Sequence, residues 1–120
     1  MGEALTIEAR HERGCTIATV IGEIDIATVT LLRERLSELV TSGRPLVADM
    51  DRVSFIDSGG LSAMVGAAKR AAAHGGSLRV VCARPEIRNL FRLTGLDSRI
   101  PLALSLDEAL EGLASGQATS

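Results

Sequence analysis

The sequence predicts a single α/β domain built on a mixed β-sheet with about four helices. Three observations predict this class: a length of 120 residues, two strand-like segments near the N-terminus joined by a polar turn, and helix-like and strand-like segments that alternate afterwards. One core is expected, because two cores would leave each half too small to bury enough apolar surface. A hairpin followed by alternating elements implies an antiparallel pair attached to parallel strands through right-handed crossovers.

The N-terminal hairpin is indicated by alternation. Apolar and polar residues alternate from Leu5 to Arg10, which is typical of a half-exposed strand. Residues 11–14 form a polar turn, and the β-branched run over residues 15–21 predicts the second strand. Gly22 is expected to end that strand.

The first helix is indicated by a change to helical spacing. Asp25 or Thr28 is placed to cap its start, and residues 42–45 end it with a Gly and a Pro. The apolar residues at this spacing are Val29, Leu32, Leu36, Leu39 and Val40.

A short buried strand and a second helix follow. Residues 46–48 are long enough only for a buried strand, and residues 49–54 are expected to form a turn beyond it. The second helix is predicted to start after Asp57 and to stop at Gly75-Gly76, which suits a left-handed cap. Its expected core face consists of Leu61, Met64, Val65 and Ala68.

The remaining elements continue the alternation. Residues 78–82 predict the fourth strand, Pro85 opens a short third helix that stops at Gly95, and residues 100–104 predict the last strand.

The last helix begins at the capping box formed by Ser105 and Glu108. Residues 114–120 are expected to be frayed. We therefore predict one domain over residues 1–120 with its core at about residues 5–113.

The composition excludes several classes of protein. The chain is 46% hydrophobic and 23% charged, which is typical of a globular domain. Nucleic-acid binding is disfavoured by a net charge of −2 and by the lack of any basic cluster beyond Lys69-Arg70. It is also disfavoured by the low aromatic content, since Phe55 and Phe91 are the only Phe, Tyr or Trp residues. Residues 58–68 form the longest uncharged stretch, too short for the ~18 apolar residues of a membrane span. The N-terminus does not resemble a secretory signal, so we expect a cytoplasmic protein.

No metal or cofactor is predicted. Cys15 and Cys82 share no ligand spacing with each other or with His11 and His74, so we interpret both thiols as small core residues. Three acidic residues could gather near a cation, although acidic turn residues usually cap helices and face solvent. These are Asp49, Asp51 and Asp57.

Candidate chemistry lies where the third strand leads into the second helix, since open α/β sheets place their sites at such points. Ser58 stands at or beside the N-cap of this helix, where its oxygen can accept a backbone N–H and the helix dipole favours an anion. Judged alone, Ser58 is a capping serine. A serine hydrolase is disfavoured because Ile56 replaces the first glycine of a nucleophile elbow, and a phosphate loop is disfavoured because no lysine follows Gly59-Gly60 before Lys69.

The second helix also carries a flat face of small residues beside its expected core stripe. Either a partner or a neighbouring helix of the same domain could approach this face closely. Its members are Gly59, Ser62, Ala63, Gly66, Ala67 and Arg70.

An ordered set of motifs completes the pattern: Gly22 to Asp25, Asp49, Phe55 to Leu61, Gly75-Gly76, and Pro85 through Phe91 to Gly95-Leu96. Together they resemble the STAS domain, and specifically the small stand-alone anti-sigma-factor antagonists of bacteria. The resemblance covers about residues 5–113.

The resemblance implies a regulatory binding module in transcription that works by partner switching and is not an enzyme. Its partner is both an anti-sigma factor and an ATP-dependent serine kinase. The unphosphorylated module binds this partner and frees the sigma factor, the phosphorylated module lets go, and a phosphatase restores it. Neither nucleic acid nor a membrane is an expected partner.

The resemblance assigns these roles to individual residues that fall on the family's motif positions. Ser58 falls on the phosphoacceptor position, and Asp25 and Asp57 fall on acidic positions that form or shape the docking surface. The sequence departs from the family at Gly59, where relatives often carry Ser, Thr or Ala, so that one hydroxyl stands in place of two. The expected partner-binding residues are Asp25, Asp57, Gly59, Gly60, Ser62 and Gly66.

Two other functions stay open at this point. A STAS subunit of a lipid or anion transporter, or of a sensory assembly, would form a stable complex without phosphoryl exchange. An enzyme would need a catalytic base near Ser58, and the sequence offers none there.

Overall fold

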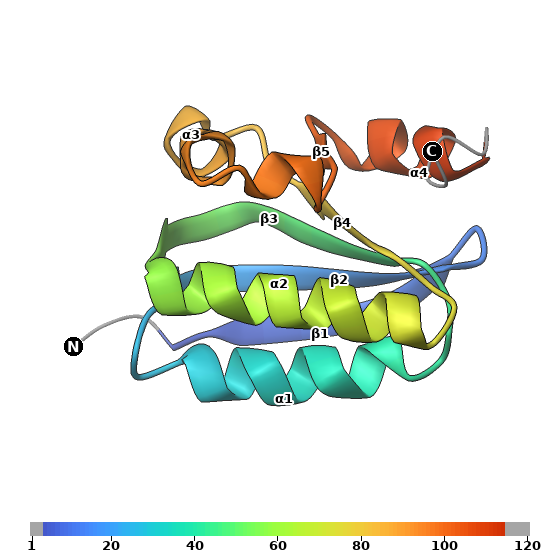
Figure 1. Ribbon diagram of the computed structural model, residues 1–120, viewed down its shortest axis with the longest axis horizontal. Helices are drawn as coiled ribbons and strands as arrows, with labels where there is room; N and C mark the ends of the chain where they lie inside the picture. Colours follow the sequence, from blue (N-terminus) through green and yellow to red (C-terminus); the bar gives the residue numbers. More distant parts are fainter. Residues whose placement is uncertain (1–3, 115–120) are drawn as a thin grey trace.

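The computed structural model describes residues 4–114, which form a five-stranded sheet in the order β1-β2-β3-β4-β5 (Figure 1). β1 and β2 are antiparallel, whereas each later pair of neighbours is parallel. The predicted mixed sheet is therefore confirmed. The strands are β1 (Thr6–Glu12), β2 (Cys15–Ile24), β3 (Leu46–Ile56), β4 (Leu78–Val81) and β5 (Leu102–Ala103).

The helices cover both faces of this sheet. One large core cluster joins α1, α2 and α3 to one face, and a smaller cluster lies between the other face and α4. Figure 1 shows α1 and α2 running side by side. The helices are α1 (Val29–Val40), α2 (Ser58–Ala73), α3 (Pro85–Leu93) and α4 (Leu106–Ala114), with a 3-10 turn η1 (Leu96–Ser98) after α3. Ala114 is the last residue of α4, and the rest of the expected frayed tail lies outside the described residues.

The hairpin turn between β1 and β2 is tighter than predicted. β1 continues to Glu12, and only Arg13 and Gly14 form the turn, with φ angles of 53° and 79°. Two consecutive positive φ angles define the two-residue turn whose twist matches that of the flanking strands.

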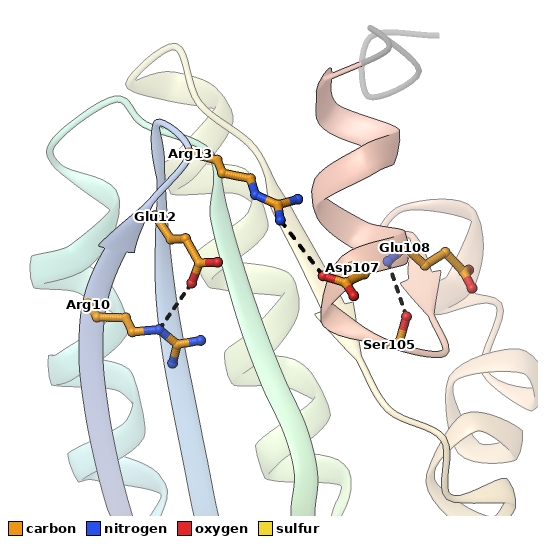
Figure 2. A network of polar contacts seen from close by, with 6 residues as sticks. All are labelled: Arg10, Glu12, Arg13, Ser105, Asp107 and Glu108. Atoms are coloured by element: carbon orange, nitrogen blue, oxygen red, sulfur yellow. Dashed lines mark hydrogen bonds and ion pairs between the residues drawn. The ribbon is translucent and has the colours of Figure 1, made fainter.

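The tip of the hairpin reaches the start of α4 (Figure 2). The Arg13 guanidinium lies 4.0 Å from a carboxylate oxygen of Asp107, and the Glu108 backbone N–H donates to Ser105 Oγ at 3.1 Å. The predicted Ser105 cap is thus confirmed. The ion pair is exposed, so its contribution to stability is small.

The predicted turn over residues 49–54 is wrong, because β3 continues through it to Ile56. The register between β2 and β3 shifts twice, and each shift places one extra residue in β3. Such bulges break the strict alternation by which a strand is recognised. The buried residues Met50, Val53 and Ile56 therefore fall three apart instead of two.

Gly22 does not end β2 as expected. The strand passes through Gly22, which has a φ of 121° and at which a Cβ would lie 2.8 Å from the Ala4 carbonyl oxygen. As a result β2 and β3 end at the same level, where the Asp57 N–H donates to the Ile24 carbonyl oxygen at 3.2 Å. This bond brings the chain around Asp25 next to the start of α2.

Both cysteines lie in the core, as predicted. Cys15 and Cys82 are free and buried. Burial raises the pKa of each thiol above its ordinary value, which keeps both protonated at neutral pH.

Candidate functional site

Ser58 is the first residue of α2, and the capping residue is its neighbour Asp57. Asp57 has an extended backbone, and its Oδ1 accepts the Gly60 N–H at 2.9 Å. The expectation that the Ser58 hydroxyl caps the helix is thereby corrected, since the Asp57 carboxylate already occupies that role. The Ser58 side chain is exposed at the positive end of the helix.

Asp25 shapes the turn that leads from β2 into α1. Its Oδ1 accepts the N–H groups of Ala27 and Thr28, at 2.9 and 3.2 Å. Thr28 is the N-cap residue of α1, but its hydroxyl donates to the Glu23 carbonyl oxygen at 2.8 Å and makes no cap bond to the helix. The turn leaves Ile26 at its tip.

Two exposed apolar side chains flank these polar residues, and neither was predicted from the sequence to lie on the surface. Ile26 is 90% exposed and Phe55 is 48% exposed. Large apolar side chains on a surface often mark a protein-interaction site. For Ile26 the spacing gave no signal, because this isoleucine lies three residues before Val29 and so continues the apolar spacing of the helix that follows it.

The acidic residues do not form one cluster. Asp49 lies on β3, eight residues before Asp57, which directly follows the strand. Eight residues of extended chain separate the two side chains by a distance on the order of 20 Å. The Asp49 carboxylate instead accepts the Asp51 N–H at 3.2 Å, and Asp51 accepts the Ala83 N–H at 2.7 Å. Within residues 4–114, no group of three His, Cys, Asp or Glu side chains could hold a metal ion.

The small-residue face of α2 is divided between the interior and the surface. Ala63 and Ala67 are buried in the core, whereas Val65 and Ala68, assigned to the core face, are only partly buried. Packing inside the domain, one of the two alternatives, therefore accounts for part of this face. The outward part carries Gly59, Ser62, Gly66 and Arg70.

Gly60, expected to bind a partner, is buried. A Cβ at this position would lie 2.6 Å from both Ile24 Cγ2 and Ile56 Cγ1. Gly60 thus permits α2 to approach the ends of β2 and β3, and it offers no docking surface.

The outward part of this face borders a groove between α1 and α2. Its volume is about 220 Å³, and its lining residues are Arg33, Ser62, Ala63, Gly66 and Arg70. The Arg33 guanidinium donates to the Gly59 carbonyl oxygen at 3.5 Å, which places the groove beside the first turn of α2.

The cap at Asp57 gives a direct stability prediction. Asp57→Ala removes the acceptor for the Gly60 N–H and should lower the free energy of unfolding by about 1 kcal/mol. Asp57→Asn keeps an acceptor and should lower it by less than half as much. Urea denaturation of the two variants tests this. Equal losses would show that the cap bond does not stabilise α2.

Comparison with known proteins adds to this description. A family model of the STAS domain matches residues 6–109. The chain is 30% identical over 99 residues to the anti-sigma-B factor antagonist of Bacillus subtilis, covering 82% of this chain and 91% of that protein. It is 34% identical over 93 residues to the anti-sigma-B factor antagonist of Staphylococcus aureus, covering 77% and 86% respectively.

A solved structure agrees with these matches. The crystal structure of an anti-sigma factor antagonist from Mycobacterium paratuberculosis superimposes with a TM-score of 0.84 at 32% identity, covering 91% of this chain and 93% of that chain. None of the helices within residues 4–114 has the length and the apolar character that a membrane span requires.

Proposed function

The chain belongs to the STAS domain family, and from this membership we propose that it is an anti-sigma-factor antagonist switched by phosphorylation of Ser58. The names of relatives at 30% identity or more support the antagonist function. The observation that carries the switch is the exposed hydroxyl of Ser58 on the first turn of α2, released from capping by Asp57.

The partner in this proposal is an anti-sigma factor that is also a serine kinase and acts in the cytoplasm. It docks on the surface around Ser58, where Asp57 adds charge and the Asp25 turn presents Ile26. Exposed apolar side chains such as Ile26 and Phe55 fit a protein partner, since they gain from leaving water. Gly59, Ser62 and Gly66 extend this docking surface along α2.

Phosphorylation acts through charge. A phosphate on Ser58 adds about −1.5 to −2 charges beside Asp57. The helix dipole stabilises an anion there by up to about 1 kcal/mol, whereas an unpaired dianion in a desolvated interface costs several. The complex therefore dissociates while the fold is kept, and a phosphatase reverses the change.

The proposed activity is binding without turnover. A nucleophilic serine needs an adjacent base. His74 stands at the far end of α2, about 24 Å along a 16-residue helix. The nearest titratable group in sequence is the Asp57 carboxylate, which is held by the helix cap. Ser58 is thus suited to accept a phosphate and not to attack a substrate.

The test combines binding and mass measurements with the anti-sigma-factor kinases encoded in the source genome. We expect a complex without ATP, one phosphate on Ser58 after incubation with Mg-ATP, and loss of binding by the phosphorylated chain. A stable complex with no phosphoryl exchange would contradict the proposal and favour a subunit of a transporter or sensory assembly.

A further inference from the structure

We propose that the groove between α1 and α2 binds an aspartate or glutamate side chain of the partner, held by Arg33 and Arg70. We call this groove, lined by Arg33, Ser62, Ala63, Gly66 and Arg70, the arginine groove. The identity of the partner rests on the proposed function, whereas the carboxylate chemistry rests on the groove itself.

Arg33 connects the arginine groove to the phosphorylation site. Its guanidinium crosses from α1 to the first turn of α2, where its one hydrogen bond to the described part of the chain is the 3.5 Å contact with the Gly59 carbonyl oxygen. Gly59 directly follows Ser58. A segment that docks on Ser58 therefore meets Arg33 next, and the remaining donors of this guanidinium are free to bind it.

The Arg70 guanidinium lies against α2 at Gly66, where the glycine has no side chain to occupy the space. The Cβ position of Gly66, one turn earlier on α2, is 3.4 Å from Arg70 Nη1 and 3.9 Å from Nη2. The guanidinium thus lies along the flank of the helix, in the arginine groove. Its Nε is buried and has no hydrogen-bond partner among the described residues. Because Nε is enclosed, a ligand in the arginine groove would reach this guanidinium through its Nη groups.

The charge in the arginine groove is not balanced by its own walls. Among residues 4–114, neither Arg33 nor Arg70 has a carboxylate oxygen within 4.0 Å. On the neighbouring surface of α1, Glu38 is paired with Arg35 at 3.4 Å, and Glu34 faces the wider hollow beside the groove. Two guanidinium groups with free donors therefore face one groove.

Size and chemistry indicate the ligand. A volume of about 220 Å³ is below the 300–1,000 Å³ typical of small-molecule sites, so the arginine groove fits a single side chain. Guanidinium groups bind carboxylates through paired hydrogen bonds. Arg33 and Arg70 also line a wider hollow of about 670 Å³ on the α1 side, where the half-exposed Leu31 offers apolar contact for the rest of the segment.

The first test does not require the partner. The ¹⁵N-labelled chain is titrated with a hexaglutamate peptide, and a hexaglutamine peptide serves as the uncharged control. We expect hexaglutamate to shift the amide signals of Gly59, Ser62 and Gly66, and both Arg33→Gln and Arg70→Gln to abolish these shifts. Arg92→Gln, an exposed arginine on α3, is the charge-matched control and should keep them. Shifts that persist in Arg33→Gln and Arg70→Gln, or that centre on other arginines, would overturn the proposal.

The second test uses the anti-sigma-factor kinase that binds the wild-type chain. Arg33→Gln and Arg70→Gln should each weaken this binding about tenfold and reduce its dependence on salt, whereas Arg92→Gln should change neither. If the wild type binds a kinase and all three variants bind equally, the arginine groove is not used and the proposed function stands. If the wild type binds no kinase, the proposed function fails and the peptide titration still decides the chemistry of the arginine groove. Circular dichroism melts show that each variant is folded.

Discussion

Ser58→Asp will weaken binding to the anti-sigma-factor kinase by about 100-fold, whereas Ser58→Ala will bind as tightly as the unphosphorylated wild type. A carboxylate fixed at this position would be desolvated by the partner beside the existing charge of Asp57. Leaving such a charge unpaired in an interface costs about 2–5 kcal/mol, and 1.4 kcal/mol corresponds to a tenfold change in affinity. Ser58→Ala also cannot be phosphorylated, so its complex should persist in Mg-ATP.

The two Ser58 variants should differ little in stability. Because Asp57 caps α2, Ser58→Ala removes no cap bond and should change the free energy of unfolding by less than about 0.5 kcal/mol. In Ser58→Asp the new carboxylate gains from the helix dipole, by about 0.3–1 kcal/mol, and is repelled by Asp57. A large difference in binding therefore cannot result from unfolding.

Calorimetric titration against the kinase, beside urea denaturation of each variant, checks these values. Ser42→Asp is the matched control, since Ser42 is an exposed serine before β3, at the opposite end of the sheet. It should bind like the wild type. Equal affinities for the two Ser58 variants, or phosphate on Ser54 or Ser62 with Ser58 unmodified, would contradict the switch.

The order of the elements could be predicted from local patterns, and the extent of β3 could not. A helix such as α1 is recognised from its own spacing, because its apolar face repeats within the segment. The bulges of β3 depend on how β2 lies beside it, and this register is not visible in the local sequence. The resulting three-residue spacing of Met50, Val53 and Ile56 does not alternate as a strand should.

Part of the candidate site could likewise be predicted from the sequence, and part of it could not. Ser58, Asp57 and Asp25 were located by motif position, and the structure places them at neighbouring ends of β2 and β3. Capping by Asp57 and exposure of Ile26 depend on backbone geometry that a motif does not encode. The core face of α2 was predicted from large apolar residues such as Leu61 and Met64. The closest approach of α2 to the strands, however, is made at its smallest residue, Gly60.

Gly60→Ala is predicted to lower the free energy of unfolding by about 2 kcal/mol. The added methyl would lie 2.6 Å from carbon atoms of both Ile24 and Ile56, closer than such atoms can approach. Both isoleucines are buried in the large core cluster, so relief requires a shift of α2 or of the strand ends. Overpacking of this kind costs about 1–3 kcal/mol, and the better helix propensity of alanine offsets up to about 1 kcal/mol.

Gly59→Ala is the matched control, because it adds the same methyl to the same helix turn. There, among the described residues, the methyl would come within 4 Å of Asp57 Oδ1 alone, at 3.4 Å. Gly59→Ala should therefore be as stable as the wild type or slightly more stable, while Gly60→Ala should melt about 8 °C lower in a calorimetric scan. Since Ile24 and Ile56 directly precede Asp25 and Asp57, Gly60→Ala should also displace the docking surface and weaken kinase binding. If the two variants melted at the same temperature, α2 would not depend on this close approach, and Gly60 could lie on the surface of the helix after all.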